Sequence, residues 1–110
     1  MIGIDIVDVG RKIPKGVFSG YELEYIHDKG VVADQTAAGL FAAKEAYFKA
    51  LGTGVPISKL AQIEIHHDSQ GKPYYALLGS PVKGAALSIS HTSKTAVAVC
   101  IMQEKWLGLS

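Results

Sequence analysis

The sequence predicts an α+β fold in which a small antiparallel sheet packs with one long helix and one shorter helix. Three features support this class: an alternating β-branched segment opens the chain, two helical segments follow it, and two hairpin-like pairs of strands fill the second half. Helices and antiparallel strands that are segregated along the chain are typical of α+β proteins. With 110 residues and 48% hydrophobic composition, the chain is long enough for one core, so we expect a single domain over residues 1–110.

The opening segment, residues 2–9, alternates with a period of two, which predicts a strand. One face carries Ile2, Ile4 and Ile6, and the other carries Gly3, Asp5 and Val7. A carboxylate in an apolar strand has to reach water, hydrogen bonds or a metal, because burying it without partners is costly. The simplest expectation is therefore that the face with Asp5 is exposed.

Two helices follow the strand. Ser19 and Glu22 have the spacing of a capping box, so a short helix is expected to run to about His27 and to end at Gly30. Asp34 can cap a second helix that continues to Ala50 or Leu51. That helix stops where Gly52 supplies the left-handed conformation that other residues resist.

The second half of the chain predicts two hairpins. Residues 62–67 and 74–78 flank the turn sequence DSQGKP, which places His66 and His67 on a hairpin where we expect them to be exposed. Residues 86–91 and 95–102 are joined by a short polar turn. The last strand is apolar on both faces, so we expect it to be central in its sheet.

Composition excludes several classes of function. The formal net charge is only +1, which provides no overall field for nucleic acid or an anionic membrane. The longest apolar run, AVAVCIM, is far shorter than the roughly 18 residues of a membrane span. The single cysteine, Cys100, suits a reducing compartment, and the amino terminus lacks a basic signal-peptide region. We therefore expect a cytoplasmic protein with no membrane or nucleic-acid partner.

The long helix carries three charged residues among apolar ones. At 100° per residue, with Phe41 at zero, Glu45 and Lys49 lie near about 40° and 80°, in a strip between an alanine sector and a bulky sector. Lys44 lies near about 300°, within the bulky sector. One interpretation is an ion pair between Glu45 and Lys49, with Lys44 extending past its neighbours to solvent. Another is that Asp5 and Glu45 together hold Mg²⁺, which takes one or two protein carboxylates and completes its shell with water and phosphate oxygens.

Four motifs occur together and in order: Gly3-Ile4-Asp5-Ile6-Val7-Asp8, Phe41-Ala42-Ala43-Lys44-Glu45-Ala46 with Lys49-Ala50 and Gly52-Thr53-Gly54, Gly71-Lys72-Pro73, and Ser88-Ile89-Ser90-His91-Thr92. In this combination the chain resembles the holo-acyl-carrier-protein synthases, over about residues 2–102. The resemblance implies a 4′-phosphopantetheinyl transferase-like fold. It also implies a Mg²⁺-dependent transfer of 4′-phosphopantetheine from coenzyme A to a serine of an apo acyl carrier protein, with release of adenosine 3′,5′-bisphosphate.

The resemblance also implies roles for individual residues. Asp5 and Glu45 match the metal ligands, and Lys49 matches a lysine beside coenzyme A that can meet phosphate or support the leaving group. Lys44 is a weaker candidate, with a structural and a phosphate-contacting role both open. The expected coenzyme contacts further include Gly52, Thr53, Gly54, His91 and Thr92, although a glycine loop that ends a helix needs no ligand. The proton acceptor stays unassigned between Glu45 and a metal-bound water.

Partner contacts are expected from the basic turn after the first strand. Arg11 matches a family position and is the best candidate for docking the acidic carrier protein, while Lys12 and Lys15 either assist or form a solvated turn. Family members are commonly trimers with active sites between subunits, which we also expect here. The chain departs from the family at Leu40, where arginine is common near the nucleotide phosphates. That departure favours an alternative, a binding module for coenzyme A or a carrier protein without catalysis; a purely structural α+β domain is a third possibility.

Overall fold

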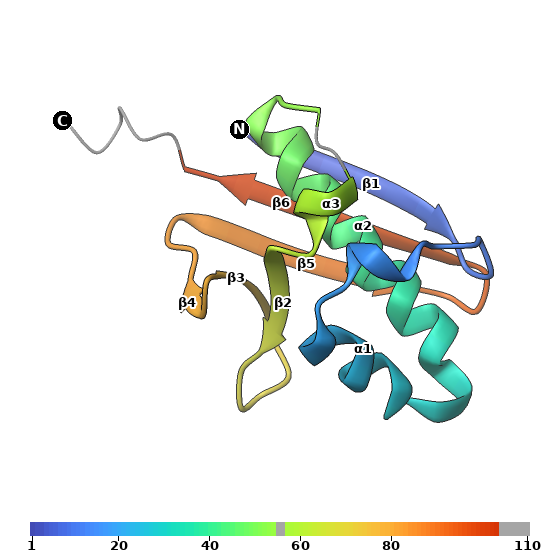
Figure 1. The fold of residues 1–110 in the computed structure, drawn as a ribbon. Helices are drawn as coiled ribbons and strands as arrows, with labels where there is room; N and C mark the ends of the chain where they lie inside the picture. The colour runs from blue at the N-terminus through green and yellow to red at the C-terminus, as the bar shows by residue number, and fades with distance from the viewer. Residues whose placement is uncertain (55–56, 104–110) are drawn as a thin grey trace, which may run out of the picture.

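A computed structural model describes residues 1–54 and 57–103. The elements in order are β1 (Ile2–Asp8), η1 (Lys15–Val17), α1 (Gly20–His27), η2 (Gly30–Val32), α2 (Ala33–Leu51), α3 (Ile57–Leu60), β2 (Ile63–His67), β3 (Pro73–Leu77), β4 (Ser80–Pro81), β5 (Ala85–His91) and β6 (Thr95–Met102). The predicted α+β class is confirmed, with two three-stranded antiparallel sheets in place of one small sheet (Figure 1).

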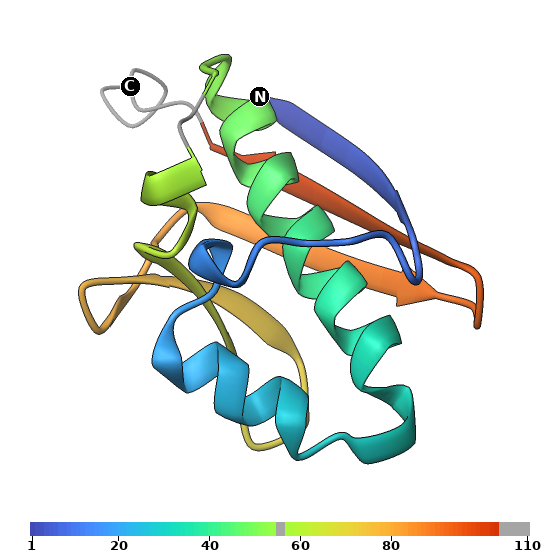
Figure 2. The same cartoon turned by 45° about the vertical axis from the view of Figure 1, so that its right-hand side comes forward.

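The larger sheet has the order β1-β6-β5, so the prediction that the last strand is central is confirmed. Its inner face packs against α2, which lies across the sheet (Figures 1 and 2). The inward residues of β6 are small, namely Ala96, Ala98 and Cys100, and each has an exposed fraction of 0%. The outer face instead leaves large apolar side chains in the open: Ile2, Ile4, Ile6 and Ile101 are 53–69% exposed.

Close packing of α2 on the sheet depends on small residues. Ala42, Ala43, Ala46 and Ala50, the predicted alanine sector, are at most 4% exposed. A Cβ on Gly3 would lie 1.9 Å from the carbonyl oxygen of Ala46, so the backbone of β1 touches the helix directly. This contact puts the face with Gly3, Asp5 and Val7 inside. The expectation that the face with Asp5 is exposed is therefore wrong, because the alternating isoleucines point outward instead.

The ends of the helices test the predicted caps. Ser19 and Glu22 form the expected capping box of α1. Asp34 does not cap α2: the N-cap is Val32, with no side-chain cap, and Asp34 lies in the first turn. The turn η2 leads directly into α2, so the helix begins two residues earlier than a cap at Asp34 would place it. Gly52 ends α2 in the left-handed conformation, with φ of 73°, as predicted.

The second sheet, β2-β3-β4, covers one end of the molecule together with α1 (Figure 2). The β2–β3 hairpin is confirmed, whereas β4 and α3 were not predicted because both are very short. The expectation that His66 and His67 are exposed is wrong. Both rings are half-buried, because His66 stacks on Tyr21 with ring centroids 4.1 Å apart and His67 stacks on Tyr25 at 4.5 Å.

Candidate active site

The first part of the candidate site is an ion pair between β1 and α2. Lys49 Nζ donates to Asp5 Oδ1 at 2.8 Å and to the carbonyl oxygen of Ile4 at 3.1 Å. The Asp5 side chain is 15% exposed and that of Lys49 is 54% exposed, so the pair lies at the edge of the packed interface and is open to solvent. The strand and the helix that were predicted to pack together therefore do so at these two residues.

Glu45 lies one turn before Lys49, which places it on the same flank of α2. Within the described residues Glu45 makes no ion pair with Lys49, so the predicted pair along the helix is replaced by the pair between Lys49 and Asp5. Glu45 therefore lies on the side of α2 from which Lys49 reaches Asp5.

The donor chemistry of this flank fits a hard cation. Two carboxylates are a set that Mg²⁺ accepts when water and phosphate oxygens supply the remaining ligands. In residues 1–54 and 57–103 no group of three or more His, Cys, Asp or Glu side chains could enclose a metal. The residues therefore suit a cation that is shared with a substrate better than one enclosed by protein ligands.

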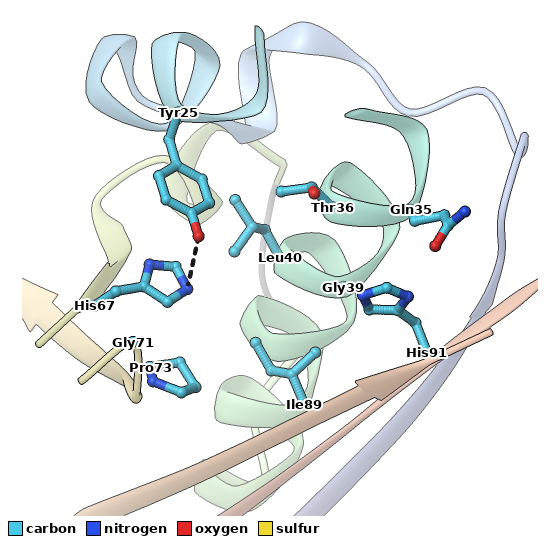
Figure 3. Close-up of a pocket in the computed structure, with 10 residues that line it drawn as sticks. All are labelled: Tyr25, Gln35, Thr36, Gly39, Leu40, His67, Gly71, Pro73, Ile89 and His91. Atoms are coloured by element: carbon cyan, nitrogen blue, oxygen red, sulfur yellow. Dashed lines mark hydrogen bonds between the residues drawn. The ribbon is translucent and has the colours of Figure 1, made fainter. Parts of the chain in front are cut away.

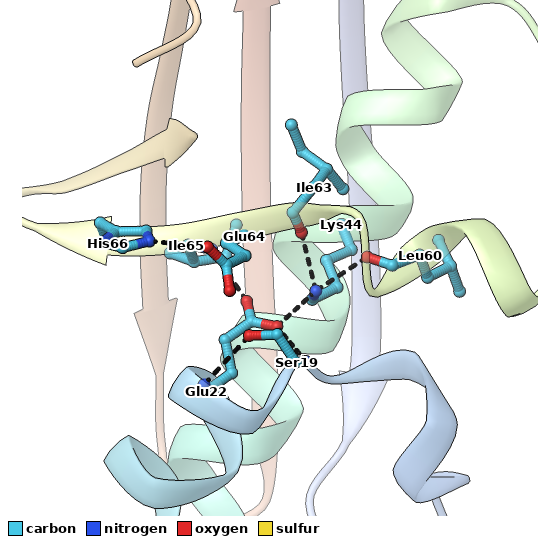
Figure 4. A network of polar contacts seen from close by, with 8 residues as sticks. All are labelled: Ser19, Glu22, Lys44, Leu60, Ile63, Glu64, Ile65 and His66. Carbon is cyan, nitrogen blue, oxygen red and sulfur yellow. Dashed lines mark hydrogen bonds and ion pairs between the residues drawn. The ribbon is translucent and has the colours of Figure 1, made fainter. Parts of the chain in front are cut away.

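Lys44 lies on a different side of α2 and is completely buried (Figure 4). Its ammonium group is 2.6 Å from Glu22 Oε1 and donates to the carbonyl oxygens of Leu60 at 2.8 Å and Ile63 at 2.7 Å. Burial lowers the pKa of Lys44, and the Glu22 carboxylate beside it opposes that shift. All three donor positions of the ammonium are taken, so the structural role is favoured over the phosphate-contacting one. The first interpretation, in which Lys44 extends past its neighbours to solvent, is therefore wrong.

A second part of the site is a pocket of about 190 Å³ between α1, α2, the β2–β3 hairpin and β5. Leu40 stands in its wall, with the Tyr25–His67 pair on one side and His91 on the other (Figure 3). Gly71 and Pro73 of the hairpin motif line it as well. Residues from two of the four sequence motifs thus meet around one cavity, beside Leu40.

The environment of His67 keeps its ring neutral. Burial is the main cause that lowers the pKa of His67, and the nearby Lys29 and His66 add to it. Its Nδ1 atom is buried without a hydrogen-bond partner among the described residues, while Nε2 lies 3.4 Å from the Tyr25 hydroxyl. Tyr25 and His67 both line the pocket, with the Tyr25 hydroxyl beside His67 Nε2 (Figure 3).

Comparison with known proteins identifies the family. The profile described as the 4′-phosphopantetheinyl transferase superfamily matches residues 1–100. The chain belongs to this superfamily. The holo-acyl-carrier-protein synthase of Treponema denticola is 39% identical over 118 residues, covering 93% of this chain and 96% of the relative. That of Caldicellulosiruptor saccharolyticus is 41% identical, covering 94% and 95%.

Solved structures of the superfamily share the fold. A holo-acyl-carrier-protein synthase from Bacillus anthracis, in complex with coenzyme A (3′,5′-ADP), has a TM-score of 0.79 at 33% identity, covering 94% of this chain and 96% of that one. The Helicobacter pylori synthase in complex with coenzyme A has a TM-score of 0.74 at 30% identity, covering 94% and 100%. These matches confirm the resemblance and the prediction that the chain is an enzyme of the holo-acyl-carrier-protein synthase type.

The loop Gly52-Thr53-Gly54 forms the end of α2. The amide of Gly52 donates to the carbonyl of Lys49, and that of Thr53 donates to the carbonyl of Phe48. Both amides are therefore occupied in ending α2, which argues against their predicted role as phosphate donors. Gly54 follows them as an exposed residue outside the helix.

The other predicted contacts are accessible. His91 is exposed at the end of β5, and the Thr92 hydroxyl oxygen accepts hydrogen bonds from the amides of Lys94 and Thr95, which closes the turn into β6. Arg11, Lys12 and Lys15 are all exposed in the connection after β1. The Arg11 guanidinium lies 5.4 Å from the centre of the Phe41 ring, so the first residue of this turn is held against α2.

Sequence reasoning missed Glu22, Tyr25 and His67 as members of these clusters. Glu22 was recognised only as a cap, and nothing in the sequence pairs it with a lysine 22 residues later. A usable signal was present, because a lysine within an apolar helix sector requires a buried partner. Tyr25 and His67 meet only through the packing of α1 on the hairpin, which local patterns do not reveal.

Proposed function

We propose that this enzyme transfers 4′-phosphopantetheine from coenzyme A to a serine of an apo acyl carrier protein and releases adenosine 3′,5′-bisphosphate. In this reaction the serine oxygen forms a bond to the phosphorus that carries the pantetheine arm. The bond from that phosphorus to the adenosine bisphosphate breaks. The observation that carries the proposal is the contact of Asp5 on β1 with Lys49 on α2, one helical turn after Glu45.

Each of these three residues has a role that its position supports. Asp5 and Glu45 would hold Mg²⁺, which, when bound, neutralises charge on the pyrophosphate. Lys49 lies within hydrogen-bonding reach of Asp5 and is more than half exposed, so its ammonium can also contact a phosphate oxygen or the leaving group. Phosphoryl transfer depends mainly on positioning and charge neutralisation, which suits a site with no protein nucleophile.

The pocket around Leu40 is the proposed site for the nucleotide end of coenzyme A. His91 provides a polar contact there, with Thr92 beside it, and the Tyr25–His67 pair lines the same cavity. No lysine or arginine is among the described residues that line this pocket. With leucine at position 40, we expect weaker electrostatic attraction of the nucleotide phosphates than an arginine would supply.

The two parts of the site support an active centre shared between subunits. Leu40 and Lys49 are nine residues apart on α2, which places them on opposite sides of the helix, about 180° apart. One bound coenzyme would reach both parts most simply if each came from a different copy of the chain. The outer face of the sheet, with Ile2, Ile4, Ile6 and Ile101 exposed, supplies an apolar surface for such an assembly, which we propose is a trimer.

The carrier protein is proposed to dock on the basic turn formed by Arg11, Lys12 and Lys15. These residues follow β1 directly, so a partner bound there approaches the end of the strand that carries Asp5. Carrier proteins are usually acidic, and complementary charge mainly increases the rate of association. Across the described residues, no helix combines the length and apolar character required to span a membrane.

The test is to incubate the protein with coenzyme A, Mg²⁺ and an apo carrier protein and to measure the mass of the carrier. Transfer adds about 340 Da, the mass of the phosphopantetheine group. Asp5→Ala and Glu45→Gln should each abolish transfer while the circular dichroism spectrum stays that of the wild type. Absence of transfer to several carriers would favour the alternative, a binding module without catalysis, and near-normal turnover by either variant would refute the site assignment.

A further inference from the structure

The buried pair of Glu22 and Lys44 has no part in the proposed reaction, yet it ties three regions of the chain together. We propose that this pair is a positioning device that sets the rotation of α2 about its axis and so aims Glu45 at the metal site. The inference rests on the proposed function, since Glu45 requires aiming only if it binds a cation.

The contacts of Glu22 and Lys44 fix the directions in which both side chains point. Lys44 Nζ is held from three sides, by Glu22 of α1 and by the carbonyl oxygens of Leu60 and Ile63 on either side of the turn into β2. Glu22 is equally fixed, because its Oε1 also accepts from the Ser19 amide and its Oε2 accepts from the Ile65 amide (Figure 4). Both side chains have an exposed fraction of 0%. An apolar side chain could fill the same space but would not be bound in a fixed direction.

Lys44 and Glu45 are neighbours in α2, so a fixed side chain at position 44 fixes the angle of the next one. A carboxylate on a helix lies about 6 Å from the helix axis, so a rotation of only about 10° displaces it by about 1 Å. Mg²⁺ requires near-ideal octahedral geometry, with ligand distances that hold to about 0.2 Å. A rotation too small to disturb the core would therefore misplace a ligand.

The opposite flank of α2 offers a weaker constraint on rotation. There the polar tie to β1 is the Lys49–Asp5 pair, in which Lys49 is 54% exposed and competes with solvent. The alanines that face the sheet permit close approach, but their methyl groups have no directional bonds. Among the side chains of α2, Lys44 therefore has the buried polar contacts nearest to Glu45, and the Tyr75 hydroxyl adds a hydrogen bond to the Ala43 carbonyl at 2.6 Å.

The experiment uses the double variant Glu22→Gln/Lys44→Met in the full chain. Glutamine can still complete the capping box with Ser19, and methionine fills the volume of the lysine stem without its ammonium. Removing both charges avoids the uncompensated buried carboxylate that Lys44→Met alone would leave. Ile63→Ala is the matched control, because it weakens the core at the same place but keeps the carbonyl that accepts from Lys44.

The primary readout is Mn²⁺ binding to the protein alone, followed by electron paramagnetic resonance, with the Mg²⁺ dependence of transfer as the second. We expect the double variant to fold with a lowered melting temperature, because the carbonyls of Leu60 and Ile63 lose their donor. Its Mn²⁺ affinity should fall at least tenfold, and the Mg²⁺ concentration for half-maximal transfer should rise at least tenfold. Ile63→Ala should melt at a lower temperature and bind Mn²⁺ as the wild type does. If the wild type transfers the group and the double variant binds Mn²⁺ as the wild type does, the positioning role is overturned. If the wild type neither binds Mn²⁺ nor transfers the group, the proposed function is overturned as well.

Discussion

Gly3→Ala should separate β1 from α2 and thereby damage both stability and the candidate site. The added Cβ would lie 1.9 Å from the carbonyl oxygen of Ala46 and 2.6 Å from the amide nitrogen of Ala50. Ordinary contact begins at 3.4 Å, so the strand would have to retreat by about 1.5 Å. The obstructing atoms are helix backbone, and no change of rotamer can relieve them. Overpacking of this kind costs about 1–3 kcal/mol or more.

For a chain of this size that cost corresponds to a fall in melting temperature of about 5–15 °C, measured by circular dichroism. Asp5 lies two residues from Gly3 on the same face, and its oxygen is 2.8 Å from Lys49 Nζ. A retreat of the strand would break that contact, so transfer to the carrier protein should fall at least tenfold. Gly20→Ala is the control, since a Cβ there has no atom within 4 Å and Gly20 is the first residue of α1. A Gly3→Ala protein that melts within about 2 °C of wild type and transfers at a near-normal rate would refute the packing argument.

Three further predictions follow from single contacts. Lys49→Gln should lower transfer at least tenfold yet raise Mn²⁺ affinity about twofold to fivefold, because the lysine ammonium competes for Asp5 Oδ1 with the strength of an exposed ion pair; weaker Mn²⁺ binding would contradict this. His67→Phe should reduce the loss of melting temperature as the pH falls from about 7 to 5. The pKa of His67 is lowered in the folded protein, so below a pH of about 6.5 the unfolded chain binds a proton at this ring that the folded chain does not bind, and wild-type stability falls. A pH profile that is the same in the variant would show that His67 does not cause the loss. Ile4→Glu should convert the proposed trimer to monomers in light scattering and abolish transfer, because it places a charge on the exposed isoleucine face; a wild type that is already monomeric would refute the proposed trimer.

Local signals predicted much of the secondary structure, since caps and turns depend on residues that are close in the chain. The Ser19–Glu22 capping box, the left-handed Gly52 and the β2–β3 hairpin are examples. The central position of β6 was also predictable, because a strand that is apolar on both faces has to be covered or paired on both sides. The failures arose where a neighbour distant in sequence decided the outcome. The preceding turn, not Asp34, leads into α2, and His66 and His67 are half-buried because they stack on tyrosines of α1.

The candidate site divides in the same way. The residue types of Asp5, Glu45 and Lys49 left both an ion pair and a Mg²⁺ site open, and the match to the family motifs favoured the cation beside a phosphate. Which of the charged residues on α2 takes part, however, depended on tertiary contacts. Lys49 reaches Asp5 across the β1–α2 contact that Gly3 permits, whereas Lys44, five residues earlier, turns to Glu22 and is completely enclosed.

By itself, the sequence determined the fold class and the main helices and strands, because these follow from periodicity and capping within short stretches, and its motifs indicated the family. Only the tertiary structure decided which face of β1 is buried, that Lys44 belongs to the core, and that the pocket at Leu40 and the flank at Asp5 lie on opposite sides of α2. Those outcomes depend on which surfaces fit closely enough to exclude water, and that complementarity arises between residues that are far apart in the chain.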